Sequence, residues 1–157
     1  MITVRRITPE DHMDVNLVNQ LITQLVHDRR LTTQEELNQI IADPLMRLFG
    51  AFDGDRLIGM RYGYFRRGLG RWMSSTHDLV VEEAYRGQGI GQLLTQQGMT
   101  DIQQFCNEQG ESFRHYVTSN PNRRESNSLI VKLGFTLAAE AVGSHGTNLY
   151  FREFFPE

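Results

Sequence analysis

The sequence contains very little cysteine. Cys106 is the only cysteine among 157 residues, so the chain can form no internal disulfide. A chain of this kind suits a reducing compartment, and we expect a cytoplasmic protein. The first six residues, MITVRR, lack the apolar run of a secretion signal, which agrees with that expectation.

Long apolar runs and a strong charge of one sign are also missing. No stretch approaches the roughly 18 consecutive apolar residues of a membrane-spanning helix. Sixteen Lys and Arg against 19 Asp and Glu give a net charge of −3, so no overall field attracts nucleic acid. The five histidines are scattered and form no cluster with cysteine. We therefore expect no membrane, nucleic-acid or metal partner.

The composition that remains is that of a globular protein. Hydrophobic residues make up 39% of the chain and charged residues 22%, which is enough to bury a core and argues against disorder. No repeat, low-complexity run or linker interrupts the sequence. The length and this uniformity predict one domain over residues 1–157.

The hydrophobic pattern changes between strand and helix periods along the chain. Thr8-Pro9-Glu10 is typical of a helix start and predicts a helix from residue 8 to about 27. Thr33 and Glu36 have the spacing of a capping box for a second, shorter helix. The predicted order is β-α-α-β-β-β-α-β-α-β-β, a mixed α/β fold. Strands are expected at 2–7, 45–52, 57–65, 72–81, 113–118, 135–141 and 148–154, and helices at 8–27, 33–43, 89–108 and 123–132.

Three glycines, Gly87, Gly89 and Gly91, stand where the strand at 72–81 gives way to the helix at 89–108. Glycine lets backbone amides approach a ligand, and a helix start adds unpaired N–H groups and a partial positive charge. Such a turn can hold a pyrophosphate; the alternative is a tight turn that needs glycine for geometry alone. The spacing fits neither the dinucleotide fingerprint nor the P-loop.

The motif Arg86-x-x-Gly89-x-Gly91, preceded by Leu79-Val80-Val81, resembles the phosphate-binding signature of the GNAT superfamily of acyl-CoA-dependent N-acyltransferases. Segments 118–123, 126–129 and 133–135 resemble a second cofactor-side segment of many bacterial members, and residues 147–150 resemble their final strand. The predicted element order is also that of the superfamily. The resemblance implies a sheet that splays between its fourth and fifth strands, with acetyl-CoA (coenzyme A) as co-substrate in the gap.

The resemblance also assigns residues to this co-substrate. The backbone of the strand at Leu79-Val80-Val81 would pair with the pantetheine arm. The amides of the glycine turn would hold the pyrophosphate, and the side chains of Arg86 and Gln88 would add contacts to it. Asn120, Arg123 and Asn127 would either lie near the cofactor or cap the helix at 123–132, and both alternatives remain open. The expected cofactor-binding residues are Leu79, Val80, Val81, Arg86, Gly87, Gln88, Gly89, Ile90, Gly91, Gln92, Asn120, Arg123 and Asn127.

Transfer of an acetyl group to an amine needs a base, because a free alkyl amine has a pKa of about 10. By strand alternation, His77 shares a face with Leu79, and Asp78 lies on the other face. The position of His77 relative to Arg86 is similar to that of a histidine in some members of the superfamily. A histidine suits proton transfer at neutral pH, so we predict His77 as the base and a structural role for Asp78.

The resemblance breaks at Ile130. Many members have a tyrosine there that can protonate the leaving thiolate, and isoleucine has no proton to give. Because a thiol pKa is only about 8.5, the thiolate can leave without an acid. Water, Ser128 or Tyr150 could substitute, and Tyr150 is the second predicted catalytic residue, with a packing role as its alternative.

These observations predict an acetyl-CoA-dependent N-acetyltransferase that acts on a primary amine of a small molecule or peptide by direct attack on the thioester. The alternatives are a transferase of a longer acyl group and a non-catalytic acyl-CoA-binding sensor. The superfamily also makes a homodimer an open possibility. A basic group along and after the third strand could attract an acidic acceptor or simply be a solvated strand end; it comprises Arg61, Arg66, Arg67 and Arg71.

Overall fold

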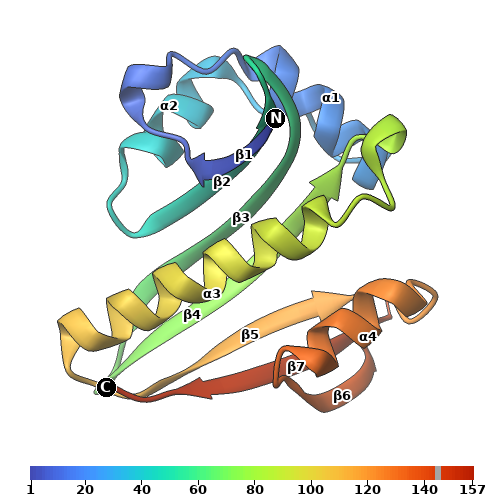
Figure 1. Ribbon diagram of the computed structural model, residues 1–157. Helices are drawn as coiled ribbons and strands as arrows, with labels where there is room; N and C mark the ends of the chain where they lie inside the picture. The colour runs from blue at the N-terminus through green and yellow to red at the C-terminus, as the bar shows by residue number, and fades with distance from the viewer. Residues whose placement is uncertain (144–145) are drawn as a thin grey trace. The chain divides into compact units, whose positions relative to one another are not determined.

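The computed structural model describes residues 1–143 and 146–157 (Figure 1). Its elements follow the order expected from the sequence, with two short 3₁₀ turns added. They are β1 (Ile2–Arg6), η1 (Pro9–Asp11), α1 (Val15–Leu25), α2 (Gln34–Ala42), β2 (Met46–Asp53), β3 (Arg56–Gly68), β4 (Arg71–Val81), η2 (Glu83–Tyr85), α3 (Ile90–Gln109), β5 (Phe113–Ser119), α4 (Arg124–Lys132), β6 (Thr136–Val142) and β7 (Thr147–Phe154).

The seven strands form one mixed sheet in the order β1-β2-β3-β4-β5-β7-β6. The β4–β5 pair is parallel, whereas β1–β2, β2–β3, β5–β7 and β6–β7 are antiparallel. The parallel ladder joins three residue pairs, from Ser74↔His115 to Thr76↔Val117, although β4 continues to Val81. The predicted mixed α/β class and order of elements are therefore confirmed.

The described chain divides into two compact units. Unit 1 comprises residues 1–64 and 78–100, and unit 2 comprises residues 65–77 and 101–157. Three elements, β3, β4 and α3, contribute residues to both units. The single domain expected over residues 1–157 stays a prediction.

Unit 1 has helices on both faces of its strands. Along β2, Leu48 and Phe52 belong to one buried cluster that includes Leu21 of α1 and Leu37 of α2. Phe49 and Ala51 belong to a second cluster, which includes Ile90 and Leu94 of α3. A strand buried on both faces reads as a nearly continuous apolar run, and this explains why the sequence of β2 shows little polar alternation.

Unit 2 is built around aromatic rings. The rings of Phe65 and Phe105 stack with their centroids 3.9 Å apart, and Trp72 meets Phe105 edge-on at 5.0 Å. Phe113 of β5 packs between this group and Phe154 of β7, whose centroid lies 6.2 Å away. Aromatic pairs in these geometries stabilise a core beyond their buried area.

The helix predicted over residues 8–27 is wrong in its first half. Thr8 and Asp11 close only the single turn η1, because His12 follows in the left-handed region with φ 46°. Asp14 then caps a new helix by accepting a hydrogen bond from the Asn16 N–H at 2.9 Å. The signals of a helix start at Thr8-Pro9 therefore mark a 3₁₀ turn, and the true N-cap lies six residues later.

Candidate active site

The glycine turn of unit 1 leads from η2 directly into the 20-residue helix α3. Gly87 has φ 76° and Gly89 has φ 80°, values that residues with a side chain rarely adopt. A Cβ at either position would meet no atom within 4 Å, so backbone conformation, not crowding, requires glycine there. The turn is open and leads to the free amides of a helix start, as a binding site for an anion needs.

Gly91 differs from the other two glycines. It has no positive φ, and a Cβ there would lie 3.9 Å from a methyl of Val81, an ordinary contact. Gly91 is thus dispensable for the backbone conformation. Around it, Gln88 and Gln92 are exposed, and Ile90 is buried against the strands of unit 1.

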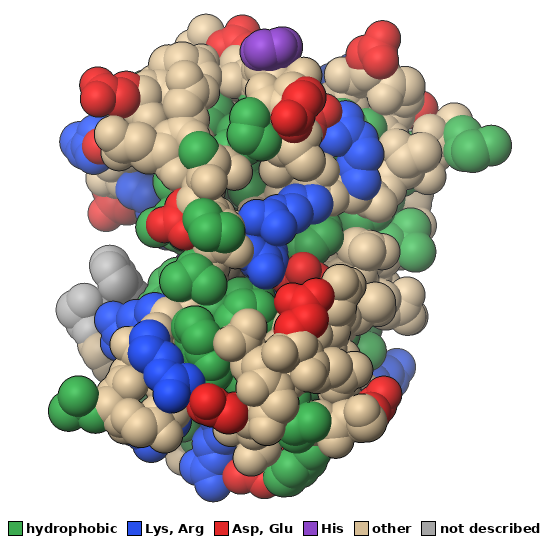
Figure 2. Space-filling model, turned by 90° about the vertical axis from the view of Figure 1, so that its left-hand side faces the viewer, with side chains coloured by type: hydrophobic (Ala, Val, Ile, Leu, Met, Phe, Trp, Pro, Cys, Tyr) green, Lys and Arg blue, Asp and Glu red, His purple; other side chains and the backbone are tan. Residues whose placement is uncertain are grey.

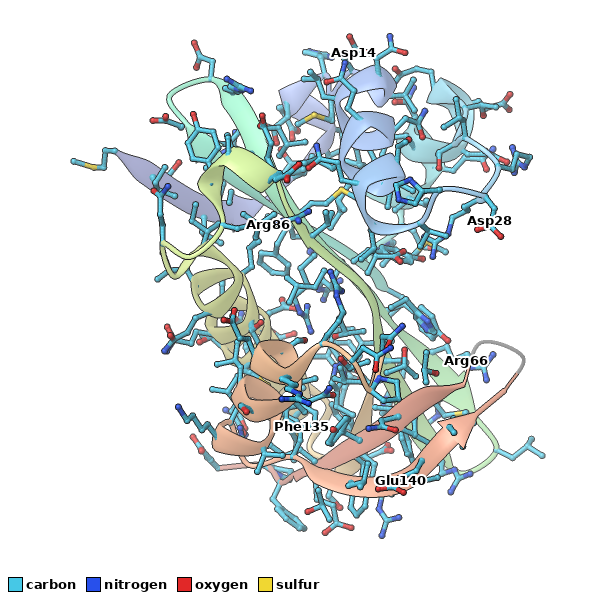
Figure 3. All side chains as sticks on the ribbon, turned by 90° about the vertical axis from the view of Figure 1, so that its right-hand side faces the viewer. Asp14, Asp28, Arg66, Arg86, Phe135 and Glu140 are labelled. Atoms are coloured by element: carbon cyan, nitrogen blue, oxygen red, sulfur yellow. The ribbon has the colours of Figure 1, made fainter. Side chains whose placement is uncertain are left out.

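Arg86 connects the turn to the strand that precedes it. Its Nε donates a hydrogen bond to the backbone oxygen of Val81 at 2.9 Å, and its backbone N–H donates to Glu83 O at 3.2 Å. The side chain is exposed, and its terminal nitrogens have no partner among the described residues (labelled in Figure 3). Arg86 therefore stabilises the turn and still offers two N–H₂ groups to a ligand.

The end of β4 in unit 1 alternates between the two buried clusters. Val80 packs with the residues of α1 and α2, whereas Leu79 and Val81 pack with Ile90 and Leu94. Asp78 is 9% exposed, and its carboxylate forms an ion pair with Arg29 at 2.9 Å. Asp78, for which the sequence predicts a structural role, thus has a charged partner.

His77 belongs to unit 2 and comes directly after the last residue pair of the β4–β5 ladder, Thr76↔Val117. The buried residues of this part of β4 are Ser74 and Thr76, and His77 is exposed. The predicted base therefore stands where β4–β5 pairing ends, on the less buried side of its strand.

The remaining predicted residues of unit 2 lie together at the start of α4. The Asn127 side chain donates to the backbone oxygens of Asn120, at 3.0 Å, and Arg123, at 2.9 Å. Its Oδ1 accepts a hydrogen bond from the Tyr150 hydroxyl at 2.9 Å. The side chain of Asn120 in turn accepts from the Asn122 N–H. These contacts account for both asparagines as residues that hold the 120–123 loop.

Arg123 and Ile130 complete this part of the site. Arg123 is exposed and its guanidinium has no partner among the described residues. Ile130, at the position where the family pattern has tyrosine, belongs to unit 2 and is 7% exposed. Tyr150 is 4% exposed, so its hydroxyl is the buried phenol of this segment.

His115 is a polar residue of this region that the sequence did not predict. This residue is 2% exposed on β5, and its Nδ1 lies 2.6 Å from Ser74 Oγ and its Nε2 2.8 Å from Thr76 Oγ1. The ring is also packed edge-on against Phe135 and Phe154. Only the register of the β4–β5 ladder brings these residues together, and no local pattern in the sequence predicts it.

The four arginines of the basic group predicted along and after the third strand have different surroundings. Arg61 is 4% exposed, and its guanidinium packs against Gly98 of α3, so it belongs to the interior of unit 1. Arg67 pairs with Glu111 at 2.8 Å. Arg66 and Arg71 have no partner among the described residues, and they are the part of the group that is available to a ligand.

No helix in the described residues is long and apolar enough to cross a membrane. No three His, Cys, Asp or Glu side chains in residues 1–143 and 146–157 gather as a metal ion would require.

Comparison with known proteins identifies the family. Residues 16–135 match the Acetyltransferase (GNAT) family, and the chain belongs to it. No curated protein matches the sequence.

Solved structures of low sequence identity share the fold. A GNAT-family acetyltransferase of Streptococcus pneumoniae has a TM-score of 0.75 at 17% identity, and the match covers 98% of this chain and 99% of that one. An aminoglycoside acetyltransferase from an uncultured soil metagenomic sample, in complex with sisomicin, has a TM-score of 0.71 at 17% identity over 90% and 93%. The PaiA N-acetyltransferase of Thermoplasma acidophilum, in complex with coenzyme A, has 0.69 at 14% over 99% of both chains.

Proposed function

We propose that this protein is an acetyl-CoA-dependent N-acetyltransferase that acts on a primary amine. The observation that supports it most strongly is the glycine turn, where Gly87 and Gly89 have positive φ in open space immediately before a long helix. Membership of the GNAT family supports acetyl-CoA as the donor. The single buried thiol suits action in the cytoplasm.

The residues fit the co-substrate in chemical type. The amides from Gly87 to Gln92 supply N–H donors for a pyrophosphate, and the terminal nitrogens of Arg86 supply a cation. Arg123 offers a second unpaired guanidinium in unit 2. The thioester supplies the acetyl group when it is bound.

His77 takes the proton in the proposed reaction. As the amine nitrogen forms its bond to the acetyl carbon, the amine loses a proton to His77, directly or through one water molecule. The carbon–sulfur bond breaks, and the electron pair leaves with the thiolate, which is stable enough at a pKa of about 8.5 to depart without a protein acid. Ile130 is therefore compatible with turnover.

The first experiment measures release of free thiol from acetyl-CoA across amino acids, polyamines, amino sugars, aminoglycosides and lysine peptides. Release above background with one acceptor class supports the proposal and defines the substrate. His77→Ala should then lower the rate most at neutral pH and least at high pH, where the amine is already neutral. An unchanged pH profile would remove His77 from the base role.

The second candidate is an acyl-CoA-binding module without turnover. Ile130 favours it, and so does Tyr150, whose hydroxyl already donates to Asn127. Binding of acetyl-CoA in a thermal-shift assay, with no thiol release from any acceptor or from longer acyl-CoA donors, would favour this candidate. Gain of turnover in Ile130→Tyr would show that the missing phenol is the cause.

A further inference from the structure

Unit 2 contains a cavity of about 630 Å³ that the residues assigned above to the co-substrate do not line. The first residues of β4 and β5 and the last residues of β7 form it, and we call it the strand-end cavity. Its volume is typical of sites for small molecules. The lining residues are Arg71, Trp72, Met73, Ser112, Phe113, Arg114, Tyr116, Glu153 and Phe155.

Much of the lining is flat and apolar. Trp72 is held in place from two sides, edge-on against Phe105 and under the guanidinium of Arg67, which lies 5.2 Å from its ring. Phe155 is 60% exposed, a large fraction for a phenylalanine. On the face that Figure 2 shows, hydrophobic side chains are exposed between basic and acidic ones. Apolar lining residues such as Met73 and Phe155 suit an apolar part of a ligand.

The charged residues that line the cavity have a net charge of +1, and one arginine among them is not compensated by a carboxylate. Arg114 forms an ion pair with Glu153 at 2.9 Å and covers the ring of Phe151, so its charge is compensated. Arg71 is exposed and has no partner among the described residues. Two arginines and one glutamate thus sum to +1. The planar, forked donors of a free arginine match a carboxylate, which makes a single anion the complementary group.

Most residues that line the strand-end cavity lie on the same face of β4 as His77, whereas Trp72 and Phe113 line it from the opposite face. Ser75 pairs with Tyr116 across the ladder, and such neighbours share a face. Met73, Ser75 and His77 share that face by alternation. Met73 and His77 are four positions apart on the extended strand, a distance of about 13 Å.

We propose that the strand-end cavity binds the far end of the acceptor, a carboxylate next to an apolar group, while the acceptor amine lies at His77. This proposal rests on the N-acetyltransferase function proposed above. The separation of about 13 Å equals roughly four extended peptide residues. The acceptors that fit best are accordingly short peptides with a free N-terminal amine, an apolar last residue and a free C-terminal carboxylate.

The test uses a matched pair of probes, the peptide Gly-Gly-Gly-Phe and its C-terminal amide. Trp72 is the only tryptophan of the chain, so its fluorescence reports occupancy of the cavity without any need for catalysis. Titration at low salt should change this fluorescence saturably with both peptides. The acid should bind about tenfold more tightly than the amide, since it adds a charged hydrogen-bonded pair with Arg71.

Two variants make the test specific. Arg71→Gln should reduce binding of the acid to the level of the amide and leave binding of the amide unchanged. Lys132→Gln is the matched control, because Lys132 carries the same charge on α4 and does not line the cavity. In the thiol-release assay, Arg71→Gln should raise KM for the acid about tenfold with little change in kcat, and Lys132→Gln should not.

Equal affinity for the acid and the amide, or an equal loss in Arg71→Gln and Lys132→Gln, would overturn the proposal. Tighter binding of the acid combined with equal KM values for the two peptides would overturn the acceptor role of the cavity. Thiol release with other amines and none with these peptides would do the same while the proposed function stands. Failure of the proposed function has a different signature, which is no thiol release with any amine while the fluorescence titration still saturates.

Discussion

The hydrogen bond between Tyr150 and Asn127 gives the sharpest stability prediction. Tyr150→Phe removes one hydroxyl from a ring that is 4% exposed, and leaves the ring in place. The lost bond, 2.9 Å long, is a neutral one whose net contribution is typically about 1 kcal/mol. We therefore expect the free energy of unfolding to fall by about 1 kcal/mol and Tm to fall by about 2–4 °C for a chain of this length.

Asn127→Ala should cost more, because this side chain has several partners. It accepts from Tyr150 and donates to the backbone oxygens of Asn120 and Arg123. Loss of these bonds costs about 2 kcal/mol, and the higher helix propensity of alanine offsets about 0.5 kcal/mol of that. The double variant should be about 1 kcal/mol more stable than the sum of the two losses predicts, because the shared bond is then counted once.

Chemical denaturation of the four proteins measures this cycle, with equal m-values as the check on a common transition. Strict additivity of the two losses would refute the argument, since it would mean that the hydroxyl and the amide do not interact. The same variants separate the two roles of Tyr150. A structural hydroxyl lowers stability and leaves kcat unchanged, as we expect, whereas an acid for the thiolate would lose kcat in Tyr150→Phe.

Three further predictions concern unit 1. Gly89→Ala should destabilise the protein by about 1–2 kcal/mol in thermal unfolding, because φ is 80° there, and Gly91→Ala, without that constraint, should not. Arg30 and the Thr33 N–H lower the pKa of Glu36 from 4.5 to about 2, so the stability advantage of the wild type over Glu36→Gln should be complete above pH 4.5 and disappear as pH falls toward 2. Asp78→Asn should lower stability through loss of its ion pair and leave the pH profile of turnover unchanged.

Each of these three predictions would be contradicted by a specific result. Equal Tm losses in the two glycine variants would show that positive φ is not what the turn requires. A Glu36→Gln difference that does not change between pH 4.5 and 2 would mean that the carboxylate has the same pKa in the folded and unfolded states. A shifted pH profile in Asp78→Asn would assign the proton transfer to Asp78.

The order of elements could be predicted because each element has a local signal. The capping box of Thr33 and Glu36 is present as expected, with the Glu36 N–H donating to Thr33 Oγ1 at 3.2 Å. The turn at Gly54, with φ 58°, joins β2 and β3 as its sequence indicates. In contrast, the start of α1 depends on the left-handed conformation of His12, which the signals at Thr8-Pro9 do not reveal.

The polar contacts of the site depend on strand register and could not be predicted. His115 is 41 residues from Ser74 and 39 residues from Thr76 in the sequence, and only the parallel ladder makes it their neighbour. The sequence around Asn127 is compatible with a ligand-binding role and equally with a helix-capping role. Its hydrogen bonds to the 120–123 loop, absent from any sequence pattern, favour the structural role.

The two adjacent candidates for the base, His77 and Asp78, differ in burial. Asp78 is buried and holds Arg29, so accepting a proton there would cost the ion pair and leave the guanidinium without its carboxylate. His77 is exposed and follows the last β4–β5 pair, so a proton taken up there can pass to water. Proton transfer at Asp78 therefore carries a structural penalty in every cycle. This penalty at Asp78 and the exposure of His77, and not residue type alone, favour histidine as the base.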